Sequence, residues 1–168
     1  KKFAGKLNYG HISTGDLFRN LQTTNTLAGR KVSALLKKGG LPPDWLAYTL
    51  WQRELVEKLV NDEQHVILDG ALRRVREAMS LDEVISWFER PLPIPILVDI
   101  TREEAFRRLK ERGRVDDTAT NINRRLDWYE TDVMPVVEYY ERQDRLLRVD
   151  GMPSPEKVFE NLLKALGF

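Results

Sequence analysis

The 168-residue chain has no cysteine, and its two histidines, His11 and His65, lie far apart in the sequence. The lack of cysteine excludes disulfides, thiol nucleophiles and cysteine-ligated zinc, and two separated histidines do not supply a dedicated zinc site. No apolar run approaches the roughly 20 residues that a membrane helix needs, and the chain shows no signal-peptide pattern. These absences predict a soluble cytoplasmic protein without a membrane partner.

An excess of charge of one sign is also lacking, because 27 Lys and Arg residues stand against 26 Asp and Glu residues and leave a formal net charge of +1. Proteins that coat nucleic acid or bind anionic membranes draw affinity from net positive charge, so neither is an expected partner. A hydrophobic share of 42% is typical of a globular protein, and the length suffices for a core without disulfides or metals. We therefore expect a single domain over residues 1–168. A monomer is a separate expectation, which these counts do not determine.

Short apolar runs alternate with stretches of helical periodicity along the chain. The runs predict extended segments at residues 9–13, 65–69, 96–100 and 145–150, of which the second and third read as buried strands. Helical patterns occupy residues 14–21, 27–38, 44–59, 81–88, 101–112, 121–140 and the stretch that begins at Ser154. Asp44 is the predicted N-cap of its helix, and Thr101 and Glu104 have the spacing of a capping box. The alternation favours the α/β class, with a parallel sheet in a three-layer α/β/α arrangement.

Polar residues suited to phosphate follow the apolar runs, where parallel sheets bind their ligands. Residues 13–16 with Arg19 follow the first run, and Asp69 and Gly70 with Arg73 follow the second. Residues 112–117, with Arg124 and Arg125, come after the helix behind the third run. Each group alone is also explained as a helix cap, a turn or a solvated helix face. Together, at one edge of a sheet, they indicate a site that handles phosphate through bidentate arginines.

These residues resemble a known family. Residues 11–19, which read H-I-S-T-G-D-L-F-R, resemble the nucleotide-acceptor motif of adenylate kinases and related nucleoside monophosphate kinases. The resemblance continues in order through residues 40–44, 66–70 with Arg73, 113–117, and 124–126 leading to Pro135 and to Tyr139 and Tyr140. It covers nearly the whole chain. It implies a P-loop-NTPase-like nucleoside monophosphate kinase fold, and reversible transfer of the γ-phosphoryl group of ATP, with Mg²⁺, to a nucleoside monophosphate. AMP is the first expected acceptor, and GMP, CMP or UMP is the alternative.

The resemblance also implies roles for single residues. Those implied to bind the monophosphate are Thr14, Gly15, Arg19, Gly40, Leu41, Pro42, Gly70, Arg73 and Glu77. Those implied to be catalytic, around the transferring phosphoryl group, are Arg73, Arg114 and Arg125. Arg112 and Arg114 would bind ATP, and Asp69 would hold Mg²⁺ through water. These residue types suit phosphoryl transfer, because in this reaction the protein neutralises charge and positions the reactants more than it takes part in covalent chemistry.

Two mobile parts are implied as well. Residues 14–44 resemble the family's monophosphate-binding helical flap, and residues 112–117 resemble a short lid that excludes water from the reaction. Within this lid, Asp116 and Asp117 follow Arg114 closely, so we expect them to fix the geometry of the arginines and not to bind a metal.

The first departure from the family is at the start of the chain, which has neither the central strand nor the phosphate loop G-x-x-x-x-G-K-[ST]. Residues 1–5 resemble the tail of the helix that follows this loop. Two explanations are open: the chain is part of a longer kinase, or it is a relative without the loop that binds nucleotide without catalysis. We favour the first, because loss of the central strand leaves its two neighbours with unpaired backbone groups. On that interpretation the 168 residues alone are inactive.

The second departure concerns the base of the monophosphate. Where the family reads Phe-Pro after Asp-Gly, this chain has Ala71 and Leu72, and Glu77 replaces the family's Gln. A Gln amide matches adenine with one donor and one acceptor, whereas a carboxylate only accepts and suits guanine N1 and N2. The base preference is therefore open. Equally, Glu77 could face solvent or pair with a neighbouring arginine.

Overall fold

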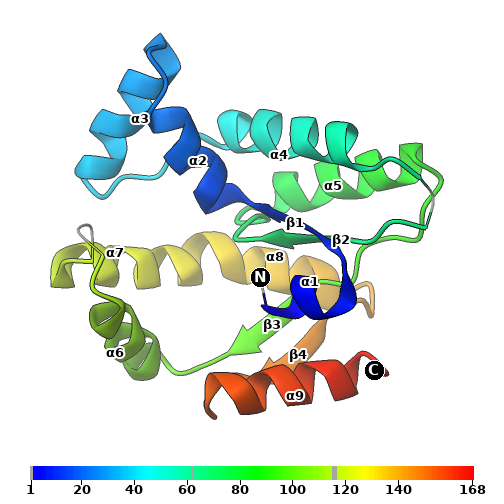
Figure 1. Ribbon diagram of the computed structural model, residues 1–168. Coiled ribbons are helices and arrows are strands. Elements are labelled where there is room, and N and C mark those ends of the chain that lie inside the picture. Colours follow the sequence, from blue (N-terminus) through cyan, green and yellow to red (C-terminus); the bar gives the residue numbers. More distant parts are fainter. Residues whose placement is uncertain (1, 62, 115–116) are drawn as a thin grey trace. The chain divides into compact units, whose positions relative to one another are not determined.

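A computed structural model of the protein describes residues 2–61, 63–114 and 117–168. The chain divides into two compact units, an N-terminal unit of Lys1–Arg90 and a C-terminal unit of Pro91–Phe168 (Figure 1). Each unit contains one pair of parallel strands with helices packed against it.

The N-terminal unit is built around the strands β1 (Gly10–Ser13) and β2 (Val66–Asp69). They pair in parallel, with Ile12 opposite Leu68 and Ser13 opposite Asp69, so their carboxyl ends lie side by side. The helices of this unit are α1 (Lys2–Leu7), α2 (Thr14–Gln22), α3 (Leu27–Lys37), α4 (Asp44–Lys58) and α5 (Val75–Trp87). Its core is formed by side chains from β1, α4 and α5 that are at most 2% exposed: Ile12, Trp51, Leu55 and Leu81.

Side-chain caps start two of these helices. The hydroxyl of Ser13 accepts a hydrogen bond from the N–H of Asp16 at 3.4 Å, and Thr26 Oγ1 accepts one from the N–H of Gly29 at 3.0 Å. The predicted cap at Asp44 is wrong, because Pro43 precedes α4 and supplies no side-chain hydrogen bond. The carboxylate of Asp44 instead forms an ion pair with Arg74, at 3.1 Å from its Nη1.

The C-terminal unit is built around β3 (Ile96–Asp99) and β4 (Leu147–Asp150), which also pair in parallel. Its helices are α6 (Arg102–Arg112), α7 (Ala119–Trp128), the π-helical turn η1 (Tyr129–Val133), α8 (Met134–Glu141) and α9 (Pro155–Ala165). In Figure 1, α9 runs along the β3–β4 pair. The buried residues come mainly from α7, α8 and β4: Ile122, Val136, Val137, Tyr140 and Val149.

The predicted fold class is confirmed: the chain is mixed α/β, and its strands pair in parallel. The helix starts at Thr101 and Ser154 are also confirmed, since Thr101 Oγ1 accepts from the N–H of Glu104 and Ser154 Oγ from that of Lys157. The predicted capping box is only half formed, because the carboxylate of Glu104 binds Arg107 and Arg108 instead of the N–H of Thr101. Within the described residues the strands form two separate two-stranded sheets. The upstream strand inferred from the sequence stays a prediction.

Three expectations about elements were wrong. The helix expected at residues 81–88 begins six residues earlier, at Val75, and the helix expected over 121–140 is divided by the π-helical turn. The third apolar run is not a buried strand, because Ile96 is 38% and Val98 is 45% exposed. The side chains of parallel strands are buried where helices cover both faces of the sheet, and the exposure of Ile96 and Val98 shows that one face of β3 lacks such a cover among the described residues.

No helix in residues 2–61, 63–114 and 117–168 has the length and apolar character needed to cross a membrane.

Close contact between α2 and α3 depends on Gly29, which is buried at the start of α3. A Cβ atom added to Gly29 would lie 2.5 Å from the carbonyl oxygen of Thr24 and 2.6 Å from that of Leu21. Both atoms belong to the backbone, so neither can move aside by a change of rotamer.

We therefore expect Gly29→Ala to lower the free energy of unfolding by about 1–3 kcal/mol, although Ala is the better helix former. Gly5→Ala in α1 is the matched control, because nothing lies within 4 Å of the added Cβ. That variant should be neutral, or more stable by up to about 1 kcal/mol. Urea unfolding followed by circular dichroism measures both changes, and a Gly29→Ala midpoint at or above that of the wild type would contradict the close approach.

Candidate functional site

The N-terminal unit places a helix start, a buried hydroxyl and a carboxylate at the carboxyl ends of β1 and β2. Thr14, the first residue of α2, is only 4% exposed, and its Oγ1 finds no hydrogen-bond partner among the described residues. The free N–H groups and the dipole at a helix N-terminus favour an anion. Ser13, which precedes Thr14, is paired in register with Asp69. This arrangement suits a phosphate group.

Arg19 brings a positive charge to the same helix start. Its Nη2 lies 2.5 Å from Asp16 Oδ1, so the side chain folds back along α2. A Cβ atom on Gly15 would lie 3.2 Å from Arg19 Nη1, which shows that the guanidinium lies against Gly15. The structure thus brings Thr14, Gly15 and Arg19 together, and their binding of a monophosphate stays a prediction.

Asp69 and Arg73 follow β2. The carboxylate of Asp69 is 59% exposed, and its Oδ2 lies 3.4 Å from Nε2 of His11. Gly70 adopts φ +68°, and its carbonyl oxygen accepts a hydrogen bond from Arg73 Nε at 3.3 Å. No group of three or more potential metal-ligating side chains occurs in residues 2–61, 63–114 and 117–168. A single exposed carboxylate nevertheless fits a hydrated Mg²⁺, because this ion keeps several of its waters.

Glu77 is buried at the start of α5, with 4% of its surface exposed, so it does not face solvent. Its Oε2 accepts a hydrogen bond from the backbone N–H of Arg73, the residue before the N-cap Arg74, and so connects the start of α5 to the chain that precedes it. Burial raises the pKa of Glu77, against the lowering effect of the backbone hydrogen bond from Arg73, and Asp44 raises it further. Its role toward the base stays a prediction.

Two further features bear on the base pocket. Leu72 adopts φ +60°, a value that the ring of the family's proline cannot reach, so the chain turns differently here. The residues expected to line the pocket, Gly40, Leu41 and Pro42, lie in the loop between α3 and α4. Their contact with a base also stays a prediction.

In the C-terminal unit, the carboxylate of Asp117 binds the arginines that were predicted to contact ATP or the transferring phosphoryl group. Its side chain is fully buried, and Arg112 donates to both carboxylate oxygens, from Nε at 2.9 Å and from Nη2 at 2.8 Å. Arg125 Nη1 donates to Oδ1 at 2.6 Å, and the backbone N–H of Arg114 to Oδ2 at 3.3 Å. Asp117 therefore fixes the geometry of Arg112 and Arg125, while the side chain of Arg114 is exposed.

The pKa of Asp117 reflects these contacts. Burial alone would raise it, but the hydrogen bonds from Arg112 and Arg125 outweigh burial and lower the pKa to about 2. The carboxylate is therefore ionised at neutral pH. Of the predicted lid, Val115 and Asp116 lie outside the described residues.

The predicted arginines thus form two groups, Arg19 and Arg73 in the N-terminal unit and Arg112, Arg114 and Arg125 in the C-terminal unit. Their convergence on one transferable phosphate stays a prediction.

An open cavity of about 530 Å³, which the sequence did not predict, lies at the carboxyl ends of β3 and β4. The residues that line it are Asp99, Ile100, Thr101, Arg148, Val149, Asp150 and Met152. Arg148 bridges Asp99 Oδ2 at 3.0 Å and Glu141 Oε1 at 2.6 Å. The sequence does contain a signal for this cavity, because an Asp-Gly pair ends the fourth apolar run (Asp150 and Gly151) as one ends the second (Asp69 and Gly70).

The depressed pKa of Asp117 gives a test. A carboxylate with a folded-state pKa of about 2, against its usual 3.8, stabilises the fold above about pH 4. This stabilisation is lost as the pH falls toward 2. We therefore expect Asp117→Asn to be less stable than the wild type near neutral pH, and the difference to close below about pH 4.

Urea unfolding at a series of pH values measures this difference. Asp127→Asn is the control, because its carboxylate is 65% exposed beside Arg102, and an exposed ion pair contributes little. A gap between wild type and Asp117→Asn that stays constant or widens in acid would show that the arginines do not stabilise the ionised carboxylate.

Comparison with known proteins places these observations in a family context. The family model described as adenylate kinase matches residues 1–145. An adenylate kinase of Thermus thermophilus is 35% identical over 170 residues, which cover 99% of this chain and 88% of the relative. Adenylate kinase 1 of Nostoc sp. is 34% identical over 164 residues, covering 98% and 88%. The adenylate kinase of Xanthomonas euvesicatoria is 34% identical over 161 residues, covering 94% and 85%.

Proposed function

The chain belongs to the adenylate kinase family, and on that premise we propose that it catalyses reversible transfer of the γ-phosphoryl group of ATP to AMP in the presence of Mg²⁺. The observation that carries the proposal is the start of α2. There a buried, unpartnered Thr14 hydroxyl and the Arg19 guanidinium lie beside the carboxyl ends of two parallel strands, within the residues that the structure describes. A nucleoside monophosphate offers phosphate oxygens that can accept from these donors.

On the acceptor side, Thr14, Gly15 and Arg19 would bind the phosphate, together with Gly70 and Arg73. A phosphate oxygen would then take over the hydrogen bond that Arg19 now makes with Asp16. The loop of Gly40, Leu41 and Pro42 would line the base. Asp69 would hold Mg²⁺ through water, and the bound ion would neutralise charge on the transferring phosphates.

On the donor side, we assign ATP to the C-terminal unit. Arg112 and Arg114 lie there, and the cavity beyond β3 and β4 is where a parallel sheet takes its ligand. Arg114 and Arg125, with Arg73, would stabilise the charge that develops on the phosphoryl group in the transition state of its transfer. Because Asp117 already holds Arg112 and Arg125, these guanidinium groups need little reorganisation when ATP binds.

The proposal concerns the protein as its gene encodes it, since the 168 residues contain no G-x-x-x-x-G-K-[ST] motif. Without that loop nothing cradles the β-phosphate of ATP, so these residues alone should not transfer phosphate. We further take the enzyme to be a cytoplasmic monomer, with residues 14–44 and 112–117 as its flap and lid. A nucleotide-binding module without catalysis is the alternative function, and GMP, CMP or UMP is the alternative acceptor.

The test is an assay of the gene product with ATP, Mg²⁺ and each of AMP, GMP, CMP and UMP. We expect transfer to AMP, with Arg114→Ala reducing turnover by about 100-fold or more. Its melting temperature should stay close to that of the wild type, because the Arg114 side chain is exposed.

Arg142→Ala is the matched control, because this arginine is 81% exposed on the surface of the same unit. It should leave turnover unchanged. No transfer to any monophosphate would overturn the proposal in favour of the binding module. An Arg114→Ala protein that melts early but keeps full specific activity in its folded fraction would make Arg114 structural.

Glu77 provides a second test within the proposed reaction. A Gln amide can donate to adenine N1 and accept from N6, whereas an ionised carboxylate only accepts. We therefore expect Glu77→Gln to raise the ratio of kcat/KM for AMP to that for GMP by about tenfold or more. The amide oxygen can still accept the N–H of Arg73, so the fold should be retained.

Glu83→Gln, which neutralises an exposed carboxylate on the same helix, controls for charge alone. If Glu77→Gln leaves the AMP to GMP ratio unchanged and only lowers stability, Glu77 is a helix cap and does not read the base.

A further inference from the structure

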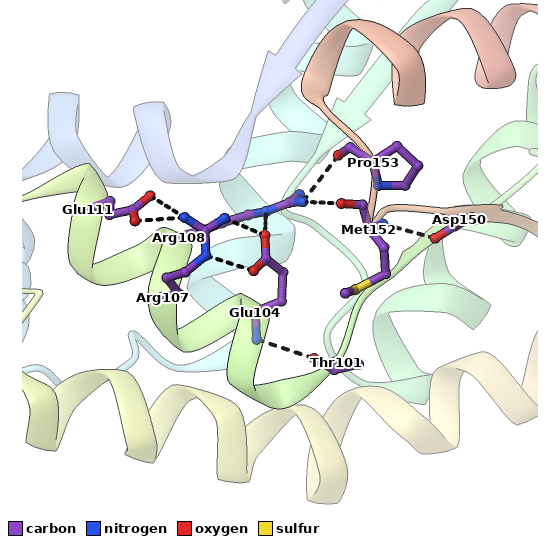
Figure 2. A network of polar contacts seen from close by, with 8 residues as sticks. All are labelled: Thr101, Glu104, Arg107, Arg108, Glu111, Asp150, Met152 and Pro153. Atoms are coloured by element: carbon purple, nitrogen blue, oxygen red, sulfur yellow. Dashed lines mark hydrogen bonds and ion pairs between the residues drawn. The ribbon is translucent and has the colours of Figure 1, made fainter.

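A side chain of α6 reaches the loop that follows β4. Arg108 Nη2 donates to the carbonyl oxygen of Met152 at 2.9 Å and to that of Pro153 at 3.2 Å, across 44 and 45 positions of sequence (Figure 2). Met152 lines the cavity at the carboxyl ends of β3 and β4. Arg108 therefore holds part of the rim of the cavity to which we assign ATP.

Arg108 is in turn held by Glu104. Its Nε lies 2.5 Å from Glu104 Oε1, and the Glu104 side chain is only 14% exposed. Arg107 donates to both oxygens of the same carboxylate, at 2.6 and 2.8 Å, and is itself bound to Glu111 at 2.7 Å. Figure 2 shows this chain of contacts running from Glu111 to the loop. Glu104 thus connects to the loop through Arg108, whereas Glu111 contacts only Arg107 in this network.

The beginning of the loop is anchored separately. The N–H of Gly151 donates to the carbonyl oxygen of Asp99 at 2.8 Å, and the N–H of Met152 donates to Asp150 Oδ1 at 2.9 Å. A Cβ atom on Gly151 would lie 2.6 Å from side-chain atoms of both Val98 and Ile100, so this residue packs tightly on β3. The amides are thus fixed locally, and Arg108 engages the carbonyls of Met152 and Pro153.

We propose that Glu104 is a positioning residue, which acts through Arg108 to fix residues 151–154 and thereby sets the affinity of the cavity for ATP. The inference rests on the proposed function, because that function names ATP as the occupant. An ordinary i,i+4 ion pair on a helix surface contributes little by itself. Here the pair orients a planar guanidinium whose remaining donors bind backbone far away in sequence.

The pKa of Glu104 agrees with this arrangement. Hydrogen bonds from Arg107 and Arg108 lower it to about 2, so the carboxylate is ionised wherever the enzyme would work. Replacement by Gln removes that charge and keeps the size of the side chain.

The experiment compares Glu104→Gln with Glu111→Gln in the protein as its gene encodes it. Both variants make the same change on α6, but only the first removes the negative charge that holds Arg108, and it leaves a weaker, neutral acceptor in its place. For Glu104→Gln we expect the KM for ATP to rise about fivefold, while kcat and the KM for AMP change by less than about twofold. Hydrogen–deuterium exchange should become faster at the N–H groups of Gly151, Met152 and Ser154, because loss of the Arg108 contacts allows the loop to open as a unit and to break its local hydrogen bonds transiently; Pro153 has no N–H. Glu111→Gln should leave all four quantities unchanged.

Arg108→Lys is the second variant, because it keeps the charge but loses the planar fork, and it should change the same two quantities as Glu104→Gln. Unchanged exchange in residues 151–154 would show that Glu104 does not hold the loop. Faster exchange with an unchanged KM for ATP would show that the loop does not set affinity. An increase in both KM values together with a fall in kcat would indicate general structural damage, and each of these results overturns the inference.

Failure of the proposed function is distinguishable from failure of the inference. If the wild type transfers phosphate to no monophosphate, the proposed reaction is lost. The dissociation constant for ATP from calorimetry then takes the place of KM. A fivefold weaker constant in Glu104→Gln, with Glu111→Gln unchanged, would support the positioning role in a protein that binds ATP without catalysis.

Discussion

Parallel pairing of short strands is the constraint on which both candidate sites depend. In the N-terminal unit the register sets Ser13 opposite Asp69, and in the C-terminal unit it sets Asp99 opposite Asp150. Because both strands of each pair run the same way, their polar ends emerge at the same edge. The start of α2 thereby comes next to Asp69, and the cavity forms where β3 and β4 end. Antiparallel pairing would send these ends in opposite directions.

Each arginine of the candidate sites discussed below forms an ion pair with a carboxylate, and the position of that carboxylate determines where the guanidinium group lies. Arg19 is turned back by Asp16, whereas Arg112 and Arg125 share the buried carboxylate of Asp117. Arg108 is oriented by Glu104, so its outer nitrogen reaches two backbone carbonyls. In each case a carboxylate aligns a planar cation before any ligand is present. For Arg112 and Arg125 such alignment would lower the entropy cost of binding the phosphates of ATP, if they act as proposed.

Local signals in the sequence predicted the parts of the structure that depend on near neighbours. The N-cap at Thr101 and the start of the last helix at Ser154 appear where the spacing predicts them. The cap at Asp44 failed because its carboxylate has a partner far away in sequence, Arg74. The start of α5 was missed because charged residues precede its apolar face, and the contact of Glu77 with the Arg73 backbone stabilises that turn.

The sequence alone determined the alternation of strands and helices, the family resemblance and the identity of the residues suited to phosphate, because periodicity and residue chemistry are local properties. Only the tertiary structure decided which carboxylate each arginine meets. It also decided that Thr14 Oγ1 is buried without a partner among the described residues, and that β3 is largely exposed. These outcomes depend on contacts between residues far apart in the chain, such as Arg108 with Met152. Such contacts leave no periodic trace in the sequence, because each partner alone is an ordinary helix or loop residue.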